Sequence, residues 1–178
     1  MPNLTPLLLF SGLLTAFPLL SVAQTCNTNG LPATTPTSRY IRYDNGTVLD
    51  QDTGLMWKAC SEGQAWNPAA HSCDLVATRY DKYEALKQAD AVNNQGGFAS
   101  FKDWRLPNIK ELFTLVERQC RNPAINLAVF PNTGADDVVI SSNYHFIKND
   151  LSIDLSSGHD IFKYGAQKSL VRLVREQK

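Results

Sequence analysis

Four cysteines constrain the fold of this chain more than any other feature, because each disulfide between them would fix two distant points of the backbone. They are Cys26, Cys60, Cys73 and Cys120. An even number of cysteines in an exported chain is typical of a disulfide framework. The loop between Cys60 and Cys73 contains the glycine and proline of turns, and a bridge closing it would contribute about 3 kcal/mol. We therefore favour Cys60–Cys73 with Cys26–Cys120 over the two other pairings. A four-cysteine zinc site is the rival interpretation, and it lacks Cys-x-x-Cys spacing.

Residues 1–23 have the pattern of a secretory signal peptide. Residues 7–22 are apolar or small apart from serine and threonine, and Ser21 and Ala23 provide the small side chains that favour cleavage after Ala23. An uncleaved membrane anchor is the alternative, but the run is short for a spanning helix and contains Pro18. We expect an exported mature chain, periplasmic or extracellular at the cell surface, with no stable membrane span.

Seventeen basic and seventeen acidic residues balance each other. This balance argues against general binding to nucleic acid or to an anionic membrane, so no nucleic-acid partner is expected. A local basic patch is still compatible with it.

Turn signals divide the rest of the chain into a leader and one domain. Residues 24–38 read as an extended leader ordered mainly by Cys26, and residues 39–178 as a single domain. Asp44-Asn45-Gly46 predicts a hairpin between strands at 39–43 and 47–49, and a turn at 51–54 leads to a strand at 55–57. This opening is a β-meander. Further strands are predicted at residues 138–141, 152–155, 161–164 and 169–175.

Two helices are predicted between these groups of strands. Thr78, with Asp81 three residues later, can cap a helix that runs to about Asn94. Its predicted buried face consists of Tyr83, Leu86, Ala89 and Val92. The order of strands, two main helices and strands, joined by long loops, predicts an α+β domain with an antiparallel β-sheet.

The second helix begins in the segment Asp103–Leu112, which reads Asp-Trp-Arg-Leu-Pro-Asn-Ile-Lys-Glu-Leu. Pro107 prevents the helix from extending backward, and Asn108 with Glu111 forms a capping-box variant. The helix is predicted to run to about Gln119. Its predicted buried stripe consists of Ile109, Leu112, Phe113 and Val116.

Three segments in order resemble a known bacterial family: Tyr43–Val48, Asp52–Trp57 and Asp103–Leu112. Over roughly residues 40–175 the chain resembles the Lcl C-terminal domain family, named after the last domain of a collagen-like surface adhesin. The resemblance implies a C-type-lectin-like fold in which the first and last strands pair and loops present the binding surface. Ile140-Ser141-Ser142 replaces the Trp-Ser-Ser of typical relatives, which puts any ligand contact built around that tryptophan in doubt.

The prominent residues of these motifs have structural interpretations. Trp57 belongs to a predicted strand, Trp104 is expected in the core, and Arg105 in a hydrogen-bonded pair. The continuously apolar segment 170–175 suggests a central strand covered on both faces. Arg172 would then be buried and must have partners, because an unpaired buried charge is very costly.

Catalytic and metal-binding patterns are weak, and we predict no enzyme and no cofactor. Asp50-x-Asp52-x-Gly54 resembles the start of a calcium loop, but a strand follows it, so a turn capped by its own aspartates is favoured. His71, His145 and His159 have no second ligand at metal spacing. Ser141-Ser142 near His145 is a poor nucleophile and base, since adjacency in a strand does not orient them.

The C-terminal residues offer a candidate ligand-binding edge. Lys163, Lys168, Arg175 and Lys178 could contact a sulfated polysaccharide, although solvated charges near a terminus are the simpler interpretation. The family resemblance implies adhesion or recognition at the bacterial surface, with an acidic glycan such as a glycosaminoglycan as ligand. The alternatives are a periplasmic structural or accessory protein that binds another protein, with a surface protein as the partner, and a hydrolase on a lectin-like fold.

Overall fold

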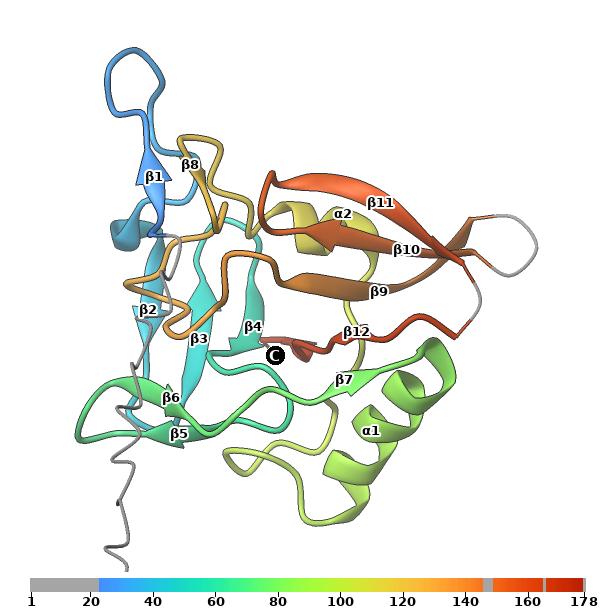
Figure 1. Ribbon diagram of the computed structural model, residues 1–178. Helices are drawn as coiled ribbons and strands as arrows, with labels where there is room; N and C mark the ends of the chain where they lie inside the picture. The colour runs from blue at the N-terminus through green and yellow to red at the C-terminus, as the bar shows by residue number, and fades with distance from the viewer. Residues whose placement is uncertain (1–22, 146–148, 165, 178) are drawn as a thin grey trace, which may run out of the picture.

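The computed structural model describes residues 23–145, 149–164 and 166–177 (Figure 1). The predicted signal peptide, apart from Ala23, and Lys178 lie outside the described residues. The architecture is α+β, with mostly antiparallel sheets and two α-helices among the described residues. No helix in this part of the chain is long and apolar enough to cross a membrane.

A four-stranded antiparallel sheet contains the predicted meander. Its strands are β2 (Tyr40–Arg42), β3 (Thr47–Asp50), β4 (Leu55–Lys58) and β13 (Val174–Glu176), in the order β13-β4-β3-β2. Gly46 adopts a φ of 79° in the first turn, as that turn requires. The last strand pairs with β4. The expectation that the first and last strands pair is therefore wrong.

A five-stranded sheet forms the second layer. Its strands are β7 (Arg79–Tyr80), β9 (Val138–His145), β10 (Asn149–Asp154), β11 (His159–Tyr164) and β12 (Ser169–Leu170), in the order β11-β10-β9-β12-β7. The β12–β9 pair is parallel and the others are antiparallel. Sequence patterns located β9, β10 and β11 and missed β7, which has only two residues.

The C-terminal segment is not the single strand predicted for residues 169–175. It pairs as β12 in the five-stranded sheet, leaves that sheet, and pairs as β13 in the four-stranded sheet. Leu170 and Val174 face one hydrophobic cluster, whereas Val171 and Leu173 face another. The continuous apolar run is thus explained by burial on two sides, as expected, while the break between β12 and β13 accommodates Arg172.

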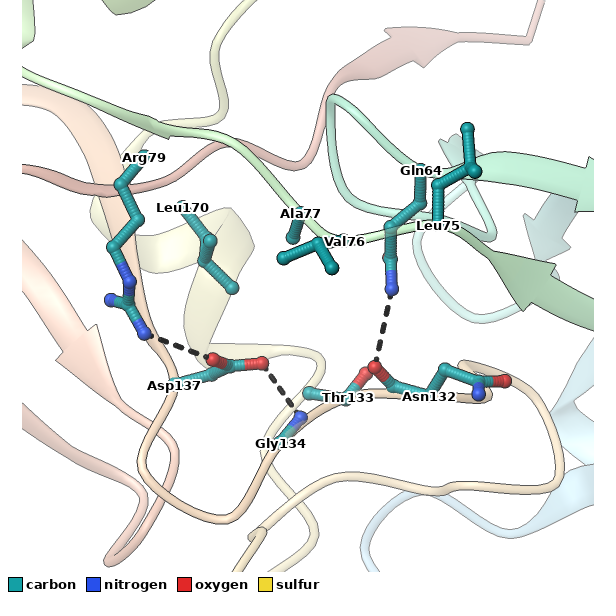
Figure 2. Close-up of a pocket in the computed structure, with 10 residues that line it drawn as sticks. All are labelled: Gln64, Leu75, Val76, Ala77, Arg79, Asn132, Thr133, Gly134, Asp137 and Leu170. Carbon is teal, nitrogen blue, oxygen red and sulfur yellow. Dashed lines mark hydrogen bonds and ion pairs between the residues drawn. The ribbon is translucent and has the colours of Figure 1, made fainter. Parts of the chain in front are cut away.

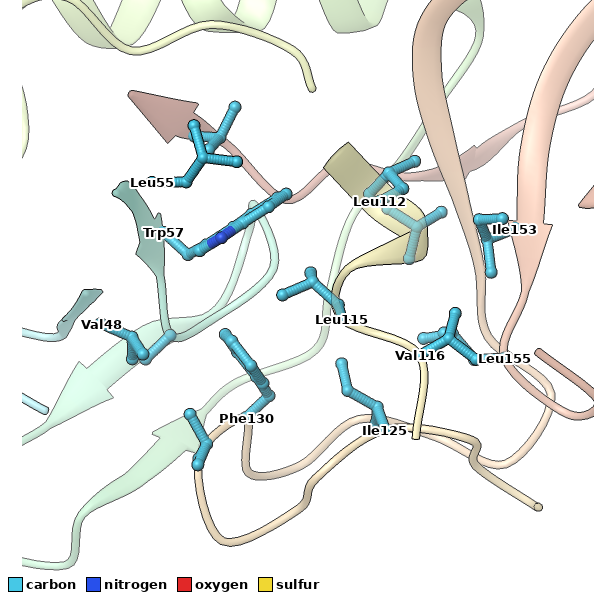
Figure 3. Close-up of a cluster of buried hydrophobic side chains, with 14 of the residues drawn as sticks. Val48, Leu55, Trp57, Leu112, Leu115, Val116, Ile125, Phe130, Ile153 and Leu155 are labelled. Carbon is cyan, nitrogen blue, oxygen red and sulfur yellow. The ribbon is translucent and has the colours of Figure 1, made fainter. Parts of the chain in front are cut away.

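Two hydrophobic clusters hold the layers together. The larger one joins β4, α2 and β10 around the fully buried Trp57 and Phe130 (Figure 3). The smaller one packs α1 against the Asp103–Leu112 segment through Trp104, Ala85 and Ala89. Trp104 is buried, as predicted, and its ring meets Phe98 edge-on at a centroid distance of 5.8 Å.

Helix α1 (Lys82–Asn94) ends where predicted and begins at a different cap. Asp81, rather than Thr78, accepts a hydrogen bond from the Glu84 backbone N–H and completes a capping box. The predicted buried face is wrong at two positions, because Tyr83 and Leu86 are exposed. Lys82, Ala85 and Ala89 are buried instead, so the helix turns its small side chains inward.

Helix α2 (Ile109–Phe113) starts at the predicted capping box and is much shorter than predicted. Beyond Phe113 the chain turns, and Val116 forms a bridge with Ile125. The Glu117 backbone N–H then donates to Ala124. Pairing with this following segment ends the helix about two turns early. Leu112 and Val116 are buried as expected, whereas Phe113 is exposed.

Both predicted disulfides are present, Cys26–Cys120 and Cys60–Cys73. The first joins β1 (Thr25–Cys26) to β8 (Cys120–Arg121), which also pair as strands. The second lies beside the hairpin of β5 (Ala65–Asn67) and β6 (Ser72–Asp74), which sequence patterns did not reveal. A 3-10 helix, η1 (Thr37–Arg39), ends the leader.

The leader is held by more than Cys26. The buried carboxylate of Glu117 accepts hydrogen bonds from the backbone N–H groups and hydroxyls of Thr34 and Thr35. Gln24 donates to two carbonyls near Ile125. The prediction of an extended leader ordered mainly by its cysteine is therefore corrected: polar contacts fix its second half.

Candidate functional site

The Asp103–Leu112 motif is a scaffold. Arg105 donates to both carboxylate oxygens of Glu111 at 2.8 Å, which confirms the predicted pair. The Glu111 carboxylate also accepts a hydrogen bond from the Asn108 backbone N–H at 2.7 Å, and the Asn108 side-chain oxygen accepts one from the Glu111 backbone N–H. Burial alone would raise the pKa of Glu111, but the Arg105 hydrogen bonds and the Asn108 N–H outweigh it and lower that pKa. Arg105 and Glu111 are thus paired within the motif.

Arg172 is buried, with 1% of its surface exposed, and its partners are neutral. Its guanidinium donates to the carbonyls of Lys58 and Ala59 and to the hydroxyls of Ser61 and Thr133. It also lies over the Phe130 ring, 5.0 Å from the centroid. Burial lowers the pKa of Arg172 to about 10, so it is still charged at neutral pH. The prediction that a buried Arg172 has partners is confirmed, and the partners are backbone and hydroxyl oxygens of residues 58–61 and Thr133.

The predicted basic edge does not form as one surface. Arg175 is only 5% exposed, since it pairs with Asp103 at 2.7 Å and stacks over Phe101. The prediction that Arg175 contacts a ligand is therefore wrong. Lys168 pairs with Glu84 at 2.9 Å. Lys163 lies on β11, in the other sheet from Arg175, and Lys178 is outside the described residues. The number of basic residues near the C-terminus could not reveal that Asp103 contacts Arg175.

A different basic site lies beside β8, in a cavity of about 390 Å³. We call it the Arg121 groove; its lining residues are Phe113, Val116, Arg118, Arg121, Ser157, Gly158 and His159. Phe113, Arg118, Arg121 and His159 are exposed.

Neither arginine of the Arg121 groove forms an ion pair with any described residue. Arg121 makes one long hydrogen bond of 3.5 Å to the Ser157 carbonyl, and no bond of the Arg118 side chain is found in this part of the chain. Free guanidinium groups present a planar set of donors that matches carboxylate and sulfate. The groove can therefore hold an anionic group beside the apolar surface of Phe113.

The groove is assembled by tertiary structure. The turn between β10 and β11 brings Ser157 and His159 next to Arg121. Gly158 permits this approach, since a Cβ there would lie 2.7 Å from a methyl group of Val116. Sequence reasoning did not place these residues in one site, because nothing in the pattern links residues 118–121 with residues 157–159.

A second cavity, of about 460 Å³, lies between loop 75–79 and loop 132–137 (Figure 2). Leu75 and Val76 stand at its edge, and Leu170 lies at its base. Asp137 is fixed on the opposite side by Arg79 at 3.4 Å and by the Gly134 N–H at 2.6 Å. Its lining combines aliphatic side chains with this ion pair and with polar loop residues.

Candidate metal ligands are not clustered. No group of three histidine, cysteine, aspartate or glutamate side chains in the described residues is arranged to hold a metal ion. Asp50 accepts hydrogen bonds from Arg39, the Asp52 N–H and the Thr53 hydroxyl. The turn interpretation of Asp50-x-Asp52-x-Gly54 is thereby confirmed.

The comparisons with known proteins address the family. No curated protein and no solved structure matches the chain. The model of the Lcl C-terminal domain matches residues 46–175, which covers most of the chain and includes the Asp103–Leu112 scaffold. The chain belongs to the Lcl C-terminal domain family.

Proposed function

We propose that this protein is an exported, non-catalytic binding module that recognises an acidic glycan at the bacterial surface, and that the Arg121 groove is its binding site. One observation carries the proposal: Arg118 and Arg121 share one cavity and have no carboxylate partner among the described residues. A sulfate or carboxylate entering the groove would meet donors that need not first leave an internal ion pair.

The groove has the chemistry of a saccharide site. Two guanidinium groups can form bidentate bonds with acidic substituents, and Phe113 offers an apolar face for the carbon side of a sugar ring. Export fits the two disulfides, which persist in oxidising compartments.

A binding role is favoured over hydrolysis by the hydrogen bonds around Ser157. Its hydroxyl donates to Asp154 at 3.3 Å and accepts from the backbone N–H of His159. In a serine hydrolase the imidazole lies between the serine and the acid. Here Asp154 accepts directly from the Ser157 hydroxyl within a turn, so the His159 imidazole does not lie between the serine and the acid.

Heparin chromatography at rising salt tests the proposal. A charge-assisted hydrogen bond is worth about 1.5 kcal/mol, so R118A and R121A should each weaken heparin binding about tenfold and shift elution to lower salt. K87A/K102A is the matched control for R118A/R121A, because it removes the same charge from exposed sites outside the groove. Equal shifts in both double variants, or passage of the wild-type protein through the column at low salt, would refute the assignment.

A further inference from the structure

Loop 75–79 presents two aliphatic side chains to solvent. Leu75 is 74% exposed and Val76 86% exposed, the two highest values among the large hydrophobic residues of the described chain. Scattered exposed aliphatic residues are common. These two are adjacent, and both line the 460 Å³ cavity. A partner that covers them would gain the burial that folding does not provide.

The backbone of this loop is strained in the conformation that exposes them. Leu75 has a φ of 67°, in the left-handed region, which costs a residue with a Cβ roughly 1–2 kcal/mol. Leucine has no polar side chain to offset that cost by a local hydrogen bond. Strain of this kind, held where the exposed residues stand, points to a binding role.

The loop is also fixed at both ends. Cys73, two residues before Leu75, is bridged to Cys60. The Thr78 backbone N–H donates to the Glu62 carbonyl at 2.8 Å, and Gly63 permits this close contact. The aliphatic pair is therefore held in place before any partner arrives, which lowers the entropic cost of binding.

The surface becomes basic beyond Arg79. An adjoining cavity of about 350 Å³ shares Arg79 and is lined by Lys87 and Lys168, with Glu84 as the acidic residue of its lining. Lys168 pairs with Glu84 at 2.9 Å, and Arg79, which is half-exposed, contacts Asp137 only at 3.4 Å. Lys87 is therefore the cation in excess, and the surplus positive charge beside an exposed, weakly held Arg79 favours a negatively charged neighbour. An aliphatic site thus continues into a basic one.

We propose that this Val76 surface, defined as Leu75, Val76, Ala77, Arg79 and Leu170, binds an extended polypeptide segment of another protein. The segment places an aliphatic side chain in the cavity beside Val76 and an acidic residue near Arg79. A glycan offers no aliphatic side chain to cover Leu75. A second copy is disfavoured, because a two-fold interface would place two sets of the same cations together. The surface shares no residue with the Arg121 groove, so it is independent of the proposed glycan site.

A phage-displayed library of random peptides, selected on the immobilised protein, is the probe. Enriched peptides should carry a leucine, isoleucine or valine close to an aspartate or glutamate. In fluorescence polarisation with a synthetic enriched peptide, V76D and R79E should each weaken binding at least about tenfold. L31D is the matched control, because Leu31 is exposed in the leader and should leave binding unchanged.

A charge exchange makes the test specific. R79E should recover affinity for a peptide in which lysine replaces the acidic residue, while the wild-type protein loses affinity for it. R118A/R121A should bind the acidic peptide normally, so failure of the glycan proposal and of this one are separable. Enrichment without this pattern, binding insensitive to V76D, a dimer in sedimentation that V76D dissolves, or loss of heparin retention in V76D alone would overturn the proposal.

Discussion

Replacing Glu117 by glutamine should release the second half of the leader. One carboxylate oxygen of Glu117 accepts from the Thr35 backbone N–H at 2.8 Å and from the Thr35 hydroxyl at 2.9 Å. The other accepts from the backbone N–H groups of Thr34 and Gln119, both at 3.0 Å, and from the Thr34 hydroxyl at 3.2 Å. A glutamine side chain has one acceptor oxygen and one NH₂ donor in place of the two acceptors.

The size of the effect follows from that exchange. Whichever way the amide of E117Q lies, its NH₂ group faces at least one backbone N–H, which then loses its partner. An unsatisfied buried donor costs about 1–3 kcal/mol, and the remaining bonds lose their charge assistance. We expect local opening of residues 27–37 to become easier by about 2–3 kcal/mol, or roughly 30- to 150-fold in amide exchange.

Hydrogen exchange followed by mass spectrometry measures this opening directly. Peptides from the leader should lose protection in E117Q, while peptides from β3 and β4 should not. E176Q removes an exposed carboxylate and serves as the control. If E117Q leaves leader protection unchanged while reduction of Cys26–Cys120 abolishes it, the disulfide alone holds the leader and the reasoning fails.

The same carboxylate makes the leader sensitive to acid. Burial alone would raise the pKa of Glu117, but the N–H groups of Gln119, Thr34 and Thr35 outweigh it and lower that pKa. A carboxylate with a lowered folded-state pKa contributes its full stabilisation above the unfolded value of about 4.3 and loses it as the pH falls through the folded value. The leader should therefore loosen below about pH 4, and E117Q should lack this pH dependence.

Two further predictions concern stability and are measured by urea unfolding. G46A should destabilise the protein by about 2–4 kcal/mol, because its Cβ would lie 2.7 Å from the Trp66 ring at a φ of 79°; G54A, at a φ of 69° with open space around it, should cost only about 1 kcal/mol, and equal losses would contradict the packing argument. R172M should cost about 3 kcal/mol by leaving the Lys58 and Ala59 carbonyls without donors; an unchanged or raised midpoint would show that relief from burying the charge dominates.

Features set by neighbours in the sequence were predictable. The capping box of Asn108 and Glu111 and the turn at Gly46 depend on residues within a few positions, and both were located. The buried face of α1 was not, because periodicity favours large apolar residues such as Tyr83. The structure buries Ala85 and Ala89 instead, whose small side chains let α1 approach the Trp104 cluster closely.

Features set by contacts between separate segments of the chain were not predictable. Helix α2 ends early because residues 116–117 pair with residues 124–125. The run 169–175 forms two short strands because its two ends pair with strands of different sheets. The Arg121 groove was not predicted for the same reason, since its two halves come from residues 113–121 and residues 157–159. Arg175, which the concentration of basic residues near the C-terminus suggested as a ligand contact, is buried and pairs with Asp103 of the motif.

The distribution of arginine partners connects the scaffold with the proposed function. Arg105 and Arg175 are paired with carboxylates at the Asp103–Leu112 motif and its neighbour β13, and Arg172 is surrounded by neutral oxygens. An acidic ligand at any of these sites would have to displace a bond that the fold already makes, which cancels much of its gain. Arg118 and Arg121 carry no such cost. R118A and R121A should therefore weaken glycan binding and keep the unfolding midpoint of the wild-type protein, because neither arginine stabilises the fold through an ion pair with a described residue.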